Sequence, residues 1–193
     1  SYEIYEKAVP ISELSDGVVA TITGTIYGNS HVTIHNGTID GSVYGGGKGG
    51  YTDDDSPGTY IAENVNVIVE NGTIKGSVYG GSAYGTVNAT DQTTNSSNYQ
   101  TNVTINNGVI TENVFGGAKG SNSFTPRVVG PITVNINGGS IGAVYGGFDA
   151  SGTPSSTDVV YLNGGVVGNA YGGGRNASQN TTDIRLQGST ING

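Results

Sequence analysis

The amino-acid sequence predicts an all-β protein, a right-handed parallel β-helix of about six coils with loop insertions on one side. Two observations predict this fold. An aromatic residue is followed by two glycines five times along the 193 residues, each time directly after a short β-like run. The copies also share the sequence before them, as in VTIHNGTIDGSVYGG and VIVENGTIKGSVYGG. Self-similarity at a period of a few tens of residues is typical of stacked units that bury a common core.

The repeat length can be measured from one apolar residue in each copy. These markers are Ile39, Ile74, Ile110, Ile141, Val167 and Ile191. Their separations are 35, 36, 31, 26 and 24 residues, and the shortest is close to one turn of a three-sided coil. The longer copies carry their extra residues after the aromatic-Gly-Gly, at 47–63, 82–100 and 118–130. Because these inserts enter at one point of the repeat, we expect them on one side of the stack.

Within a copy, apolar and polar residues alternate with period two, as in residues 32–34 and 103–105. This alternation and the many β-branched residues predict half-buried strands. An Asn-Gly or Gly-Gly pair then follows each run and predicts a corner, because both residue types tolerate a positive φ. The five pairs are residues 36–37, 71–72, 107–108, 138–139 and 164–165.

The repeat also predicts the domain organisation. Residues 1–19 lack it and are expected to cap the N-terminal end, where strand edges would otherwise be unpaired. Residues 20–193 form the repeat domain. Its last copy, from Arg185, stops before an aromatic-Gly-Gly. We therefore expect either a longer parent chain or a C-terminal edge that pairs with another strand.

The amino-acid composition limits the classes of binding partner that we expect for the chain. Seven Lys and Arg stand against 15 Asp and Glu, a net charge of −8. Binding to a phosphate backbone or an anionic membrane surface needs a concentrated positive surface, so neither partner is expected. No apolar stretch approaches the roughly 20 residues of a membrane span. The chain has no cysteine and needs no disulfides, and this absence agrees with a bacterial or archaeal surface location rather than a reducing cytosol.

Equal positions of stacked coils form columns, and two columns are candidate glycan-binding sites. The aromatic column is Tyr44, Tyr79, Phe115, Tyr145 and Tyr171. The column of small residues beside it is Val43, Val78, Val114, Val144 and Ala170. Because adjacent residues of a strand point to opposite faces, only one column can fill the core. With the small residues inside, the aromatic rings form an outer platform for sugars. The alternative is that the rings pack in the core or are covered by the inserts.

The second candidate column lies four residues past each aromatic residue. It consists of Lys48, Ala83, Lys119, Asp149 and Arg175. It collects three of the seven basic residues, with an acid between two of them. One interpretation is a solvated charge ladder, and the other is a site for an acidic sugar.

Two smaller features bear on metal binding. The run Asp53, Asp54 and Asp55 lies in the first long insert and is a candidate Ca²⁺ site, although it lacks the spacing of a known calcium loop. A solvated acidic loop is the alternative. Asp40 and Lys75 occupy equal positions and are expected to pair, as are His35 and Glu70. No further His joins them, so this does not predict a metal site.

The sequence does not predict an enzyme. Hydrolysis of a glycosidic bond needs two carboxylates held across it, and no repeated column collects two or three acids. Two histidines and no Gly-x-Ser-x-Gly motif argue against a catalytic triad. Polysaccharide cleavage by a lyase or hydrolase is kept as the third hypothesis.

The repeats V-x-I-x-N-G-x-I and V-Y-G-G resemble the glycine-rich β-helical repeats of large bacterial surface proteins and adhesins, within the pectin-lyase-like superfold. The resemblance covers about residues 20–193. It implies an extracellular, microbial cell-surface or secreted protein that acts as a rod or a glycan-binding module. We therefore expect a non-catalytic module for adhesion or scaffolding that contacts a glycan, or a host or cell-surface polysaccharide, through the aromatic column and the long inserts. The second hypothesis is a filament or stalk subunit that self-associates through the open end of the solenoid.

Overall fold

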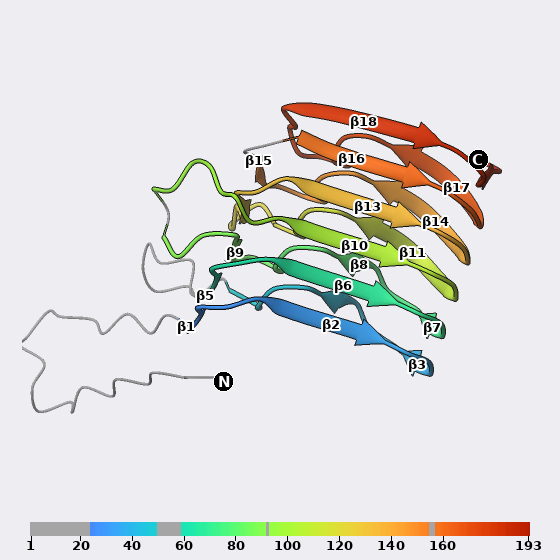
Figure 1. Ribbon diagram of the computed structural model, residues 1–193, viewed down its shortest axis with the longest axis horizontal. Helices are drawn as coiled ribbons and strands as arrows, with labels where there is room; N and C mark the ends of the chain where they lie inside the picture. The colour runs from blue at the N-terminus through green and yellow to red at the C-terminus, as the bar shows by residue number, and fades with distance from the viewer. Residues whose placement is uncertain (1–23, 50–58, 92, 155–156) are drawn as a thin grey trace, which may run out of the picture.

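The computed structural model describes residues 24–49, 59–91, 93–154 and 157–193. It is all-β in these residues, and every pairing between its strands is parallel. Strands from successive repeats stack into three sheets, which is the arrangement of a parallel β-helix or solenoid (Figure 1). The prediction of an all-β fold built from stacked parallel strands is thereby confirmed. The predicted capping segment, residues 1–19, lies outside the described residues.

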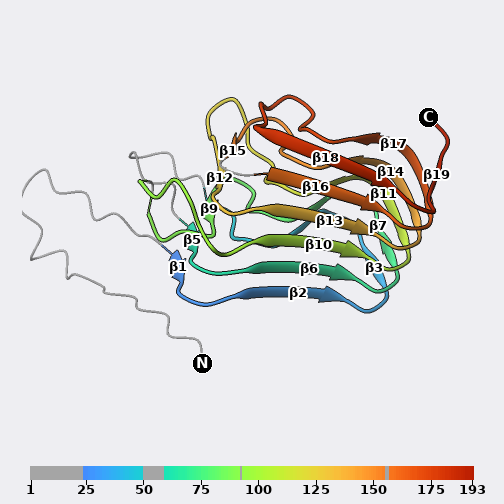
Figure 2. The ribbon, with the colours of Figure 1, turned by 45° about the horizontal axis from the view of Figure 1, so that its top comes forward.

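One sheet has six strands, which Figure 2 shows one above the other. Its strands are β2 (Ser30–Ile34), β6 (Val65–Val69), β10 (Thr101–Ile105), β13 (Ile132–Ile136), β16 (Thr157–Leu162) and β18 (Thr181–Leu186). In β6, β10 and β13 every second residue is buried, as the alternation of the sequence predicts. This sheet supplies one wall of the core.

After a corner, the chain enters an eight-stranded sheet. It contains β3 (Thr38–Ile39), β4 (Val43–Tyr44), β7 (Thr73–Ile74), β8 (Val78–Tyr79), β11 (Val109–Phe115), β14 (Ser140–Tyr145), β17 (Val166–Tyr171) and β19 (Thr190–Ile191). The corner glycines Gly37, Gly72, Gly108, Gly139 and Gly165 all have a positive φ, between 78° and 109°. A side chain is disfavoured in that conformation, which explains the glycine of each predicted corner pair.

A third, five-stranded sheet closes the coils. Its strands are β1 (Gly24–Ile26), β5 (Thr59–Ile61), β9 (Thr86–Val87), β12 (Arg127–Val128) and β15 (Thr153–Pro154). Three of them, β5, β9 and β12, lie within the segments that the sequence indicates as inserts. The inserts are therefore not only loops, because each also supplies the third strand of its coil. The connection from β9 to β10 projects on the side of this sheet (Figure 1).

The core runs the length of the stack between the sheets. The marker residues pair in register, Ile39 with Ile74 and Ile141 with Val167 among them. Val43, Val78, Val114 and Val144 also belong to the core. The column of small residues therefore faces inward, as its size predicts, and the aromatic column points to the other side of the same strands.

Candidate functional site

The aromatic column is a continuous stack of rings. Neighbouring ring centroids lie 4.7–5.0 Å apart, and the ring planes differ by only 3–12°. The order along the stack is Tyr44, Tyr79, Phe115, Tyr145 and Tyr171. In-register parallel strands place equal side chains at about 4.7–4.9 Å, and this spacing suits face-to-face contact of aromatic rings.

This stacking changes what the column can offer a ligand. The faces of Tyr79, Phe115 and Tyr145 each lie against neighbouring rings on both sides. Tyr79 and Phe115 are also buried, with 3% and 0% of their surface exposed, whereas Tyr171 is 46% exposed. A platform of five open rings therefore does not form. The ring surface that the stack leaves open belongs to Tyr44 and Tyr145, which are half-buried, and to Tyr171, which is exposed.

Backbone hydrogen bonds establish the register of the second candidate column. The amide of Tyr84 donates to the carbonyl of Lys48, and the amide of Gly120 donates to that of Ala83. Likewise the amide of Ala150 donates to the backbone carbonyl of Lys119, and the amide of Asn176 donates to the backbone carbonyl of Asp149. Each donor residue directly follows the column residue of its own coil, as Tyr84 follows Ala83, and it bonds to the column residue of the coil before. The five residues at equal positions of the repeats therefore lie on successive coils, each beside the next.

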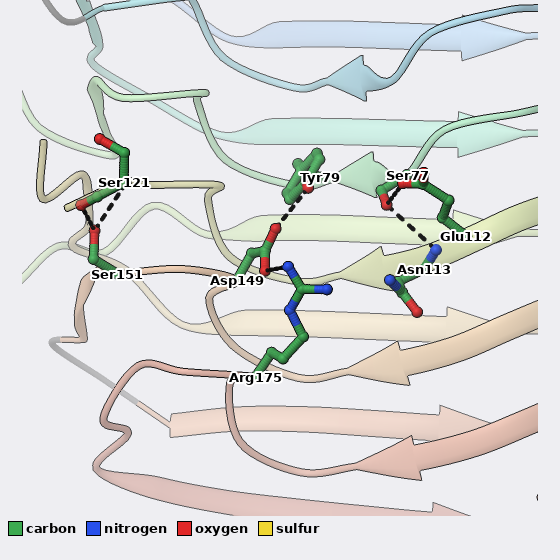
Figure 3. A network of polar contacts seen from close by, with 8 residues as sticks. All are labelled: Ser77, Tyr79, Glu112, Asn113, Ser121, Asp149, Ser151 and Arg175. Carbon is green, nitrogen blue, oxygen red and sulfur yellow. Dashed lines mark hydrogen bonds and ion pairs between the residues drawn. The ribbon is translucent and has the colours of Figure 1, made fainter. Parts of the chain in front are cut away.

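The two columns meet at Asp149. The hydroxyl of Tyr79 donates a hydrogen bond of 2.8 Å to Oδ2 of Asp149 (Figure 3). Nη2 of Arg175 lies 2.6 Å from Oδ1 of the same carboxylate, an ion pair without hydrogen-bond alignment. The guanidinium carbon of Arg175 also lies 5.8 Å from the ring centroid of Phe115. Acid, cation and rings therefore form one cluster along the edge of the stack.

Burial sets the electrostatics of this cluster. The side chain of Asp149 is only 5% exposed, while that of Arg175 is 46% exposed. Burial and the hydrogen bond to Asp149 raise the pKa of Tyr79 far above its ordinary value, so its hydroxyl stays protonated and donates. Burial also raises the pKa of Tyr145. The solvated charge ladder expected from the sequence is thus wrong for Asp149, which is a buried acceptor.

The other candidates divide between exposed and paired residues. Lys48 is exposed and Lys119 is half-buried, and neither makes an ion pair with a described residue. The predicted pair of Asp40 and Lys75 is confirmed at 2.7 Å. Glu70 instead accepts a hydrogen bond from Asn106, at 2.9 Å. The candidate calcium residues Asp53, Asp54 and Asp55 lie outside the described residues.

Asparagines that the sequence analysis did not single out form a ladder of hydrogen bonds at the corner. The side-chain amide of Asn106 donates to Glu70, that of Asn137 to Asn106, and that of Asn163 to Asn137, each at 2.9 Å. The signal was available in the sequence, because these residues precede the corner pairs in successive copies. The ladder ties coils together and presents an exposed amide edge.

Serine contacts in Figure 3 have the same stacking role. The hydroxyl of Ser77 donates to Oε2 of Glu112 and accepts from the backbone amide of Asn113. The hydroxyl of Ser151 contacts the backbone carbonyl of Ser121 at 2.9 Å. These hydroxyls bridge adjacent coils.

Asp158 is a buried acid that the sequence analysis missed. It is 2% exposed, and its Oδ2 has no hydrogen bond with a described residue. Its neighbours in register are Ile132 and Thr182, which carry no charge. Burial alone raises the pKa of Asp158 to about 8. Asp158 stands two residues before Val160 and four before Leu162, both of which are buried. This period-two pattern was the signal in the sequence for a carboxyl on the inner face.

The chain was compared with protein-family models, curated proteins and solved structures, and it matches none of them. Within the described ranges, no three His, Asp or Glu side chains are grouped closely enough to hold a metal ion. The same residues contain no helix of the length and apolarity needed to cross a membrane.

Proposed function

We propose that this chain is a non-catalytic surface module for adhesion or scaffolding, which contacts glycans along the edge and at the exposed end of its aromatic column. In this proposal it is a right-handed β-helix of about six coils within the pectin-lyase-like superfold. It belongs to a microbial, extracellular protein that resembles the glycine-rich repeat regions of adhesins.

The observation that carries the proposal is the Tyr79–Asp149–Arg175 cluster beside the ring stack. Here a buried carboxylate accepts from a tyrosine and pairs with an arginine, so its polar groups hold the coils together. A carboxylate whose oxygens already contact Tyr79 and Arg175 favours a role in a rigid surface over a role in catalysis. Tyr171, 46% exposed, supplies an aromatic ring that a sugar can reach. Apolar faces of sugars suit aromatic rings, and ring hydroxyls supply hydrogen bonds.

A glycan-array assay with and without Ca²⁺ tests this function. We expect specific retention of a glycan without product release. Tyr171→Ala should weaken retention, because it removes the exposed ring, while Tyr161→Ala serves as the matched control on the six-stranded sheet. Failure to bind any glycan would contradict the proposal. Release of shortened product would favour the polysaccharide lyase or hydrolase.

A second candidate function is self-association into a filament or stalk. Ile184 and Leu186 of β18 stand in register with buried Val160 and Leu162, yet they are 40% and 60% exposed. Within the described residues β18 pairs only with β16, and apolar side chains beside such an edge favour pairing with another strand. Sedimentation should then show a size that grows with concentration, and Leu186→Lys should abolish that growth. A constant monomer mass would contradict it.

A further inference from the structure

The polar column carries a charge pattern that points to a particular class of glycan. Its members are Lys48, Ala83, Lys119, Asp149 and Arg175, and the hydrogen bonds across each step keep them in register. Three cations and one carboxylate give this column a formal charge of +2, whereas the whole chain carries −8. Local cationic character on an acidic protein attracts an anion to one place and disfavours it elsewhere.

The residues that carry the cations belong to alternate coils, although the guanidinium of Arg175 reaches back to within 5.8 Å of the Phe115 ring, two coils earlier. Lys48 and Lys119 are separated by the coil of Ala83, and Lys119 and Arg175 by the coil of Asp149. Strands of a sheet lie about 4.8 Å apart, so alternate coils repeat at about 9.5 Å along the stack. An extended polysaccharide presents groups at regular intervals in the same way.

The cations of this column are available to a ligand to different degrees. Lys48 is exposed, Lys119 is half-buried, and neither pairs with an acid in the described part of the chain. The side chain of Arg175 is 46% exposed although Nη2 contacts Asp149. Asp149 is buried and committed to Tyr79 and Arg175, so it acts as a spacer rather than as a ligand group.

We propose that this column binds an acidic polysaccharide lying parallel to the solenoid axis, with a carboxylate or sulfate on alternate sugars. The inference rests on the proposed glycan-binding function and specifies its ligand. The lysines and Arg175 pair with the acidic groups, and the adjacent edges of Tyr145 and Tyr171 contact the sugars. Because the charges are partly solvated, the affinity depends on several contacts and falls with ionic strength.

The test uses the whole chain and hyaluronan octasaccharides, in which alternate sugars carry a carboxylate, with carboxyl-reduced octasaccharides as the neutral probe. Titration calorimetry at low and high salt should show binding of the acidic probe only, weakened by salt. Lys48→Gln and Lys119→Gln should each lower the affinity roughly two- to fivefold, the range of an exposed charge pair. Lys75→Gln, a lysine already paired with Asp40 outside the column, is the matched control and should leave affinity unchanged.

Neither lysine pairs with an acid in the described part of the chain, so these variants are expected to fold normally, and thermal unfolding checks this. Equal binding of the acidic and neutral probes would overturn the acidic-ligand inference while leaving glycan binding intact. Equal losses in Lys75→Gln and Lys119→Gln would overturn the assignment to this column. Failure of the chain to bind the octasaccharides or any array glycan would overturn the inference together with the proposed function.

Discussion

Tyr79 and Asp149 are 70 residues apart in sequence, and their side chains meet in a hydrogen bond of 2.8 Å. The contact passes over the coil that carries Phe115, whose ring stacks on Tyr79. Most contacts in a solenoid join neighbouring coils only. This one joins coils that are not neighbours.

Replacing Tyr79 by phenylalanine should destabilise the fold, because a buried carboxylate loses its donor. Hydrogen bonds to charged groups contribute roughly 1.5–3 kcal/mol, and we expect a loss in that range. Urea unfolding followed by circular dichroism measures it. Tyr145→Phe is the control, since the Tyr145 hydroxyl makes no hydrogen bond with a described residue. Equal stability of Tyr79→Phe and the native protein would refute the role given to the contact.

Phe115 should be the most sensitive ring of the stack. It is fully buried and stacked on both faces, so Phe115→Leu loses two aromatic contacts of roughly 0.5–1.5 kcal/mol each. Tyr171→Leu loses one, at a ring that is 46% exposed. The free energy of unfolding should therefore fall further for Phe115→Leu. Equal losses in the two variants would mean that stacking contributes little.

The glycine after Phe115 should not tolerate a methyl group. A Cβ at Gly116 would collide with the carbonyl oxygen of Gly146 and with the side chain of Ile132. Overpacking of this kind typically costs roughly 1–3 kcal/mol, so Gly116→Ala should lower the unfolding midpoint. At Gly41 a Cβ meets no atom within 4 Å, and Gly41→Ala should be neutral or slightly stabilising. A neutral Gly116→Ala would show that the coils can move apart.

Stability should fall as pH rises from about 4 to about 8. The pKa of Asp158 is about 8 in the fold and close to 3.9 in an unfolded chain, so the folded protein binds more protons between these values. The stabilisation is complete below the unfolded pKa and is lost as pH rises through the folded pKa. The slope approaches roughly 1.4 kcal/mol per pH unit.

Asp158→Asn should flatten that pH dependence in urea unfolding between pH 4 and 8. Asp183→Asn, on the neighbouring strand, should retain it, because Asp183 is paired with Arg185 and is not buried. A native protein whose stability is constant over this range would contradict the raised pKa that burial gives the Asp158 carboxyl.

The repeat was enough to predict the columns. Alternation within a strand and a fixed offset between copies place Val78 and Tyr79 on opposite faces of their strand, and in the structure Val78 belongs to the core while Tyr79 is buried in the ring stack. The sequence did not indicate that Asp149 would be buried, because its partner Tyr79 lies beyond the neighbouring coil. It also did not indicate the strands β5, β9 and β12. They are only two or three residues long, too short to show a period.

The Tyr79–Asp149 bond also bears on how the stack comes apart. Coils that interact only with their neighbours can detach singly from an end, and partly unwound molecules then accumulate. A bond that reaches over the coil of Phe115 makes three coils lose their order together. Under tension or protease attack, the coils of Tyr79, Phe115 and Asp149 therefore yield in one step.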